Sequence, residues 1–270
     1  MSVKAPNVLS IAGSDPSGGA GIQADLKTFS ALGCYGMAAV TALTAQNTRG
    51  VRGLHVATAE FVGAEIDAIF EDIAVDALKI GMLASPAIAN LVAARLTHWG
   101  ARNIVLDPVL VASSGDSLGA DGLAEAIVGR LLPIARLVTP NLSEIARLTG
   151  RQEPRDALDM RRAGEALLAR GAKAVLVKGG HLDASEALDL LVTPAAVETF
   201  RAPRVATRNT HGTGCTLASA IAAFLAHGRT LTEAVGAAKA YLGAALQDAD
   251  RLSVGAGHGP VHHFHSLWRD

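Results

Sequence analysis

The sequence predicts an α/β protein with a mainly parallel central sheet, helices on both faces and a short antiparallel strand pair. Three observations indicate this class. Short apolar segments of strand length alternate along the chain with longer segments of helical spacing. Most of these apolar segments run into polar or glycine-containing turns, as strands do where they end at one edge of a parallel sheet. Half of the 270 residues are hydrophobic and only 4% are aromatic, so aliphatic side chains must fill a large core.

The first half of the chain consists of strands that alternate with helices. A glycine-rich turn at 13–21 separates the first strand from its helix, and the polar residues 44–48 follow the second strand as a loop. Ser85 and Pro86 supply an N-cap and a first helical residue, and Gly100 ends the helix that follows them. The predicted strands are 8–12, 37–43, 77–82 and 103–106, and the predicted helices are 22–32, 58–70 and 86–99.

The second half continues this alternation and adds the antiparallel pair. Helices follow the strands at 103–106 and 136–139. No repeat, low-complexity tract or linker divides the chain, so residues 1–270 are predicted to form a single domain. The predicted strands are 136–139, 174–177, 186–192 and 197–202, of which the last two form the antiparallel pair, and further helices are predicted at 156–170 and from Thr216 and Thr232.

The composition favours small-molecule chemistry over binding to nucleic acid or to a membrane. A formal net charge of -1 gives no electrostatic footprint for nucleic acid or for an anionic membrane surface. No apolar segment is long enough to span a bilayer, and residues 1–6 lack the pattern of a signal peptide. Cys34 and Cys215 fit neither a zinc pattern nor a disulfide framework, so we expect a reducing, cytoplasmic environment.

The end of the chain is rich in histidine. His258, His262, His263 and His265 could ligate a metal ion. No acidic residue accompanies them in this stretch, so a packed or solvated role is the expectation.

The segment 209–215 runs directly into a pattern of helical spacing and predicts an anion site. The N-terminus of a helix presents unpaired backbone N–H groups and partial positive charge. Gly212 and Gly214 allow a phosphate to approach the backbone closely, and Cys215 lies beside it. A thiol in this position is expected to have a lowered pKa and to accept a proton near neutral pH. The alternative is that the glycines form only a tight loop and that Cys215 is a packing residue.

Polar residues follow nearly every predicted parallel strand, and the ends of such strands meet at one edge of the sheet. Each has a structural explanation by itself, as a cap, a turn or a salt bridge. Their common position predicts a single site. The residues are Asp15 with 18–21, Gln46 and Asn47, Gly81 and Met82, 107–109, Asn141 and Glu144, 178–180, and 211–215.

Common nucleotide-binding motifs do not account for this site. Gly19, Gly21 and Ala24 have the spacing of a dinucleotide-binding fingerprint, but the turn after the first strand is too long. No acidic residue ends the second strand to bind a ribose. The P-loop sequence and the protein-kinase signatures are absent from the chain.

Seven motifs in order along the chain resemble the hydroxymethylpyrimidine/phosphomethylpyrimidine kinases of the ribokinase-like superfamily. The resemblance covers nearly the whole chain, and the ordered set is highly specific. The motifs are AGSDPSGGAGIQADLKT at 12–28, TALTAQNT at 41–48, KIGML at 79–83, LDPV at 106–109, TPNLSE at 139–144, VKGGH at 177–181 and NTHGTGCT at 209–216.

The resemblance implies an enzyme of thiamine biosynthesis with a ribokinase-like fold. Such an enzyme uses MgATP to phosphorylate 4-amino-5-hydroxymethyl-2-methylpyrimidine, first to the monophosphate and then to the diphosphate. Gln46 is expected to read the aminopyrimidine edge, because a carboxamide can donate and accept in one plane. Met82 and Val109 are expected to provide apolar contacts to the ring.

The resemblance also implies roles for the remaining residues. Asp107 and Glu144, with Asn141, are the candidates for Mg²⁺ and its water shell. Lys178, Asn141 and Thr213 are expected to bind ATP, and the loop with Gly212, Gly214 and Cys215 to hold the transferring phosphoryl group. The residues expected to line the pyrimidine site are Gly19, Ala20, Asp25, Thr44, Gln46, Met82, Val109 and Cys215.

Further expectations concern the second step and the assembly. The backbone of Gly18, Gly19 and Gly21 is a candidate to receive the phosphate of the monophosphate. The stretches 113–116 and 183–185 are polar enough to move, and the sequence leaves open which loop closes over the substrate. A homodimer is expected because superfamily members are commonly dimers.

Two other functions stay open at this point. A pyridoxal or pyridoxine kinase would share the fold and the glycine loop before the final helices. A non-catalytic pyrimidine-binding protein would share the fold but is expected to have lost part of the cation and anion sites, and this chain keeps those residues.

Overall fold

The computed structural model describes residues 4–110, 120–180 and 186–268, and these form a nine-stranded sheet in the order β3-β2-β1-β4-β5-β6-β7-β8-β9. Strands from β2 to β7 in this order pair in parallel, and β3, β8 and β9 pair antiparallel with their neighbours. The strands are β1 (Asn7–Ser14), β2 (Tyr35–Asn47), β3 (Gly50–Val56), β4 (Ala77–Ile80), β5 (Ile104–Leu106), β6 (Leu137–Val138), β7 (Val175–Lys178), β8 (Glu186–Val192) and β9 (Val197–Pro203). The predicted fold class is confirmed.

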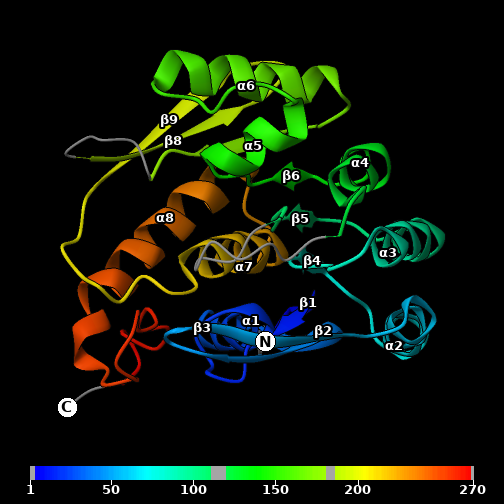
Figure 1. Ribbon diagram of the computed structural model, residues 1–270, viewed down its shortest axis with the longest axis horizontal. Helices are drawn as coiled ribbons and strands as arrows, with labels where there is room; N and C mark the ends of the chain where they lie inside the picture. Colours follow the sequence, from blue (N-terminus) through cyan, green and yellow to red (C-terminus); the bar gives the residue numbers. More distant parts are fainter. Residues whose placement is uncertain (1–3, 111–119, 181–185, 269–270) are drawn as a thin grey trace.

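Helices cover both faces of the sheet (Figure 1). On one face lie α1 (Gly21–Ala31), α7 (Thr213–Ala226) and α8 (Leu231–Gln247). On the other lie α2 (Ala59–Asp72), α3 (Pro86–His98), α4 (Leu123–Ala126), α5 (Leu142–Thr149) and α6 (Ala157–Ala169). A short π-helix spans Ile127–Leu131 and a 3₁₀ helix spans Ala249–Arg251.

Two hydrophobic cores lie on opposite faces of the sheet, and the strands supply them alternately. In β7, Val175 and Val177 join the core under α5 and α6, whereas Leu176 joins the core under α7. Because side chains of a strand point alternately to the two faces, a strand buried on both is apolar throughout. This burial explains why short apolar segments in the sequence predicted the inner strands.

The structure differs from the prediction at the β3 edge of the sheet. Residues 44–47, predicted as a loop, continue β2 and pair with β3, which was not predicted. Most residues of β3 are exposed or half-buried because it is an edge strand, so no alternation of apolar residues marks it. Helix α7 begins at Thr213 rather than at Thr216 because Gly212 ends the preceding turn in a left-handed conformation (φ 80°).

The parallel strands end level with one another, and this register positions the site. Residues that follow the last partners lie side by side at one edge of the sheet. The register partners in successive strands are Ile11 with Ile80, Ile80 with Leu106, and Leu106 with Val138. The polar residues after β1, β4, β5 and β6 therefore converge as predicted.

Some of the predicted features lie outside the described residues. The candidate closing stretches 113–116 and 183–185 lie outside the described residues, as does His181. Among the helices that the structure describes, none is both long enough and apolar enough to cross a bilayer.

Candidate active site

Two loops meet at the N-terminus of α7, and we call them the glycine loop (15–21) and the anion loop (211–215). Gly212 has a left-handed conformation, and a Cβ atom there would overlap the carbonyl oxygen of Gly19. A Cβ atom at Gly19 would in turn overlap the ring of His211. Glycine at these two positions therefore allows the loops to touch.

A side-chain pair also joins the two loops. The Nε2 atom of His211 lies 2.7 Å from Oδ2 of Asp15, and both side chains are largely buried. Burial by itself would raise the pKa of Asp15, but hydrogen bonds from His211 and Ser17 hold it below its ordinary value. Asp15 is therefore an ionised acceptor.

The carboxylate of Asp15 also organises the glycine loop from within. It accepts hydrogen bonds from the backbone N–H groups of Ser17 and Ala20, each at 2.9 Å. The N–H of Gly18 donates to the carbonyl oxygen of Asp15 at 2.9 Å. The N–H of Gly18 is therefore engaged within the loop and is not free to receive a substrate phosphate, whereas the same expectation for Gly19 and Gly21 stays a prediction.

Cys215 lies in the first turn of α7 and is half-buried. Burial raises the pKa of its thiol, and the nearby cation of Lys79 only partly opposes this effect. The net pKa lies above the ordinary value, so the expectation of a lowered pKa is wrong. The favourable helix terminus is outweighed by loss of water around the thiolate.

The carboxamide of Gln46 and an apolar cluster that includes Met82 lie near the glycine loop and the anion loop. Met82 packs with Ala42 and Ala84, and Val109 packs against this cluster. The side chain of Gln46 lies between Thr44 Oγ1, 3.1 Å from its Oε1, and His211 Nε2, 3.4 Å from its Nε2. The structure thus brings the predicted pyrimidine residues Thr44 and Gln46 to the anion loop.

A cluster of charged residues lies on the other side of the anion loop. Lys178 Nζ is 2.8 Å from Asp107 Oδ1 and 3.9 Å from Glu144 Oε2. A Cβ atom at Gly214 would lie 3.5 Å from Lys178 Nζ and 3.7 Å from Asp107 Oδ2, so this cluster borders the loop directly. These are the residues predicted to serve ATP and Mg²⁺.

The two carboxylates of the cluster differ in pKa. Burial raises the pKa of Glu144 to about 7, and Asp107 adds to the increase although Lys178 opposes it. Burial would also raise the pKa of Asp107, but the cations of Lys178 and Lys79 hold it below its ordinary value.

Asn141 and Glu144 form a capping box at the start of α5. Asn141 Oδ1 accepts from the N–H of Glu144 at 2.8 Å, and Glu144 Oε2 accepts from the N–H of Asn141 at 2.7 Å. This role explains the residue types locally. Within the described ranges, no group of three or more His, Cys, Asp or Glu side chains is arranged to hold a metal ion.

Asp25, predicted to contact the pyrimidine, lies beneath the site and is fully buried. It accepts from Ser10 Oγ and Ser219 Oγ, each at 2.6 Å, and from Lys79 Nζ at 2.9 Å. With both oxygens engaged inside the protein, Asp25 supports the site rather than lining it.

Sequence reasoning missed Lys79 and the partner of Asp15. Lys79 is fully buried in β4, below Cys215 and Asp107, whose charges both act on it. The available signal was a charged residue in the middle of an apolar strand segment. The pairing of Asp15 with His211 had no local signal, because the two residues are far apart in the sequence.

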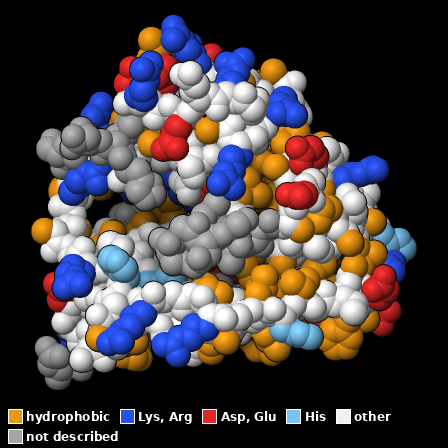
Figure 2. Space-filling view, in the orientation of Figure 1, with side chains coloured by type: hydrophobic (Ala, Val, Ile, Leu, Met, Phe, Trp, Pro, Cys, Tyr) orange, Lys and Arg blue, Asp and Glu red, His pale blue; other side chains and the backbone are white. Residues whose placement is uncertain are grey.

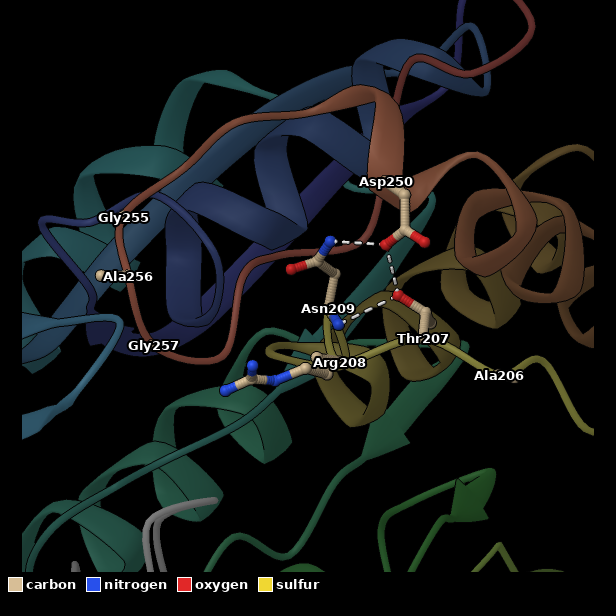
Figure 3. Close-up of a pocket in the computed structure, with 8 residues that line it drawn as sticks. All are labelled: Ala206, Thr207, Arg208, Asn209, Asp250, Gly255, Ala256 and Gly257. Carbon is tan, nitrogen blue, oxygen red and sulfur yellow. Dashed lines mark hydrogen bonds between the residues drawn. The ribbon is translucent and has the colours of Figure 1, made fainter.

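The segment before the anion loop is fixed by Asp250 (Figure 3). Its Oδ1 atom accepts from Thr207 Oγ1 at 2.7 Å and from Asn209 Nδ2 at 2.8 Å. These residues line a hollow of about 660 Å³ that contains none of the predicted site residues. The hollow therefore adjoins the segment that leads into the anion loop. Its lining is Ala206, Thr207, Arg208, Asn209, Asp250, Gly255, Ala256 and Gly257.

The fold is that of the small-molecule kinases of the ribokinase-like class. The chain belongs to the phosphomethylpyrimidine kinase family, whose model matches residues 15–262. The resemblance seen in the sequence is thereby confirmed.

Individual relatives agree with this assignment. The chain is 55% identical to a hydroxymethylpyrimidine/phosphomethylpyrimidine kinase of Rhizobium meliloti over 97% of this chain and 98% of the relative. Among solved structures it is similar to a phosphomethylpyrimidine kinase of Clostridium difficile, with 43% identity, a TM-score of 0.78 and coverage of 88% and 97%. It is also similar to a pyridoxal kinase of Staphylococcus aureus in complex with AMP-PCP and pyridoxal, with 33% identity, a TM-score of 0.90 and coverage of 98% and 96%.

Proposed function

We propose that this chain uses ATP to phosphorylate 4-amino-5-hydroxymethyl-2-methylpyrimidine to its monophosphate and then to its diphosphate in thiamine biosynthesis. The position of the anion loop is the main support. Gly214 borders Lys178 and Asp107 on one side, and Gly212 touches the glycine loop on the other. A phosphoryl group at the N-terminus of α7 would lie between the side that binds ATP, which we call the donor side, and the side that binds the pyrimidine, which we call the acceptor side.

On the acceptor side, the residues suit an aminopyrimidine. The Gln46 carboxamide offers a donor and an acceptor to the aminopyrimidine edge, and Met82 with Val109 offers an apolar surface. Ala20 lies next to the contact between the two loops. Family membership supports the same substrate.

On the donor side, we propose that Lys178, Asn141 and Thr213 bind ATP. The molecule is hollowed left of the centre in Figure 2, and Lys and Arg side chains are more frequent on that side than on the hydrophobic right side. The cation of Lys178, which borders the anion loop at Gly214, would bind the phosphates.

The donor set fits Mg²⁺ that arrives with ATP. Asp107 and Glu144 supply hard oxygen atoms, and Lys178 already neutralises part of their charge. Two carboxylates suit an ion that keeps water and phosphate ligands. When bound, the ion would neutralise charge on the phosphates.

The residues of this chain would contribute mainly by positioning and charge stabilisation. The N–H groups at the start of α7 and Lys178 would stabilise the negative charge of the transferring group. The thiolate form of Cys215 would accept the proton of the hydroxymethyl group as the new P–O bond forms, while the bond from the γ-phosphorus to its bridging oxygen breaks and ADP leaves. Asp107 and Asp15 would hold Lys178 and His211 in place.

The test is ³¹P NMR of the purified protein with MgATP and hydroxymethylpyrimidine, beside pyridoxal and a control without acceptor. We expect the monophosphate to appear first and the diphosphate to follow. A single phosphorylation that is faster on pyridoxal would overturn the proposal and favour a pyridoxal kinase. The similarity of the chain to pyridoxal kinase structures is the reason to include this acceptor. Absence of turnover with both acceptors would favour a non-catalytic pyrimidine-binding protein.

We also propose a homodimer in a reducing cytoplasm. Leu43, Leu54 and Val56 on β2 and β3 are exposed apolar side chains at one edge of the sheet, where a second copy could cover them. Cys34 and Cys215 are free thiols. Sedimentation velocity is expected to give a dimer, and Leu54→Lys is expected to shift it toward the monomer. A monomeric wild-type protein at micromolar concentration would contradict this.

A further inference from the structure

The carboxamide of Gln46 lies between two groups whose hydrogen-bonding roles are fixed by other partners. Its Oε1 is 3.1 Å from Thr44 Oγ1, and its Nε2 is 3.4 Å from His211 Nε2. The oxygen and nitrogen of a carboxamide exchange places when the group rotates by half a turn, so the neighbours decide its orientation.

The neighbour at the Thr44 end is an acceptor. Thr44 has one hydroxyl hydrogen, and its Oγ1 donates to the carbonyl oxygen of Ser14 at 2.9 Å. A carbonyl oxygen can only accept, so this hydrogen is committed. Toward Gln46 the hydroxyl oxygen can then only accept, and it requires an N–H group there rather than an oxygen.

The neighbour at the His211 end is a donor. Asp15 is an acceptor that already binds the backbone N–H groups of the glycine loop, and its Oδ2 is 2.7 Å from His211 Nε2. The hydrogen must therefore lie on His211 Nε2 and point to Asp15. With its hydrogen directed at Asp15, this N–H group has no lone pair to accept from the Gln46 amide nitrogen, and two N–H groups would face each other. The amide oxygen is therefore favoured at this end.

The Thr44 end and the His211 end of the carboxamide favour the same orientation. The first does so through Ser14 and the second through Asp15, so the two arguments are independent. We propose that Thr44 and the Asp15–His211 pair are positioning residues that hold the Gln46 carboxamide with its nitrogen toward Thr44 and its oxygen toward His211. This proposal rests on the proposed function, because it concerns how the acceptor is read.

The orientation has a consequence for the substrate. The free edge of the carboxamide offers an acceptor on the His211 side and a donor on the Thr44 side. An aminopyrimidine then binds with its amino group near His211 and the adjacent ring nitrogen near Thr44. In the ring, the carbon that bears the amino group lies between this nitrogen and the carbon that bears the hydroxymethyl group. The hydroxymethyl group therefore lies beyond the amino group, on the side of His211, and points toward the anion loop. The reverse orientation would turn it away from Cys215.

The test compares hydroxymethylpyrimidine with its analogue that lacks the amino group, 5-hydroxymethyl-2-methylpyrimidine, in steady-state kinetics. The variants are Thr44→Val, which removes the acceptor, and His211→Phe, which keeps a ring without the N–H. Thr44→Ser keeps the hydroxyl group and serves as the conservative variant. Thr97→Val removes a hydroxyl group on the far helix α3, where Thr97 donates only to the carbonyl oxygen of Ala93, and serves as the control.

We expect the wild type to prefer the amino substrate, and Thr44→Val and His211→Phe to lose about tenfold or more in kcat/KM for it. The loss on the analogue should be smaller by about tenfold in each of these variants, because an effect of His211→Phe on the anion loop itself acts on both acceptors and cancels in their ratio. Thr44→Ser and Thr97→Val should keep the wild-type preference.

Equal losses on both acceptors in Thr44→Val and His211→Phe, or a wild type without preference for the amino group, would overturn the inference. Circular dichroism of each variant separates loss of folding from loss of selectivity. Failure of the wild type to phosphorylate either pyrimidine would instead contradict the proposed function, so the two failures are distinguishable.

Discussion

At the scale of single residues, Cys215 shows how burial can reverse a local signal. A cysteine in the first turn of a helix ordinarily has a lowered pKa. Here burial raises the pKa, the carboxylates of Asp25 and Asp107 add to the increase, and Lys79 with the Gly21 N–H acts in the opposite direction. At neutral pH the residue is therefore mainly a thiol, and a role as proton acceptor depends on the minor thiolate form.

This gives a prediction for the pH dependence of turnover. A base must be deprotonated to act, so kcat of the wild type is expected to keep rising through and above the ordinary thiol pKa of about 8.5. Cys215→Ala should lower kcat by about 10²–10⁴, lose this rise and leave KM for ATP nearly unchanged. Steady-state kinetics across this pH range measure both. A flat profile in the wild type, or near-normal turnover in Cys215→Ala, would make Cys215 a packing residue.

At the scale of elements, one buried ionic network joins four parts of the fold beneath the site. Asp25 of α1 binds Ser10 of β1, Lys79 of β4 and Ser219 of α7. Lys79 and Asp25 are fully buried. Removing one partner leaves a charge in the interior without compensation, which is more costly than the pair itself is stabilising.

Lys79→Met is accordingly expected to lower the free energy of unfolding by about 3–5 kcal/mol. A matched control is Lys239→Met, because Lys239 pairs with Asp189 at the other side of the fold and both side chains keep some exposure, 11% and 10%. The control should lose less. Urea denaturation followed by circular dichroism measures both variants, and equal losses would show that burial of the Asp25 pair has no special cost.

The contact between the glycine loop and the anion loop is expected to matter for kinase activity, and not only for stability. Gly212 and Gly228 lie just before and just after α7 with φ of 80° and 83°, but only at Gly212 would a Cβ atom overlap another loop. Alanine at either position is expected to cost about 1–2 kcal/mol through its backbone conformation. Only Gly212→Ala should also lose most of its kinase activity. Thermal unfolding and turnover of both variants test this, and similar activities would argue against the contact between the loops.

The elements were largely predictable because their signals are local. Ser85 caps α3 and Asp156 caps α6, as short-range patterns indicate. Strand β3 was missed because an exposed edge strand lacks apolar alternation. In the site, motif order predicted that Gln46, Lys178 and Cys215 converge. The pairs Asp25–Lys79 and Asp15–His211 join distant parts of the chain, so no local pattern could reveal them.

At the scale of the whole molecule, the C-terminal segment closes over the glycine and anion loops. The backbone N–H of His211 donates to the carbonyl oxygen of Gly259 at 3.0 Å. Tyr241 of α8 donates to the carbonyl oxygen of His263 at 2.6 Å, and Thr216 of α7 lies 3.1 Å from the ring of His263. The histidine-rich end, for which the sequence left packing, solvation and metal binding open, thus includes a packed residue that ties α7 to α8.

His263 makes this closure sensitive to acid. Burial lowers its pKa to about 3, and electrostatic repulsion from Lys27, His262 and His265 adds to the decrease. The folded protein keeps the ring neutral, whereas the unfolded chain takes up a proton at its ordinary pKa of about 6.5. Between these two values the unfolded state binds more protons, so stability falls as the pH falls.

We therefore expect the wild type to lose up to about 1.4 kcal/mol of unfolding free energy for each pH unit below about 6.5, relative to His263→Gln. Glutamine keeps an acceptor for Thr216 but does not titrate, and other groups cancel in the comparison. The exposed His98→Gln should follow the wild type. Urea titrations from about pH 7 to about pH 4 measure the difference. If it stays constant across this range, protonation of the buried His263 ring is not what loosens the C-terminal segment in acid.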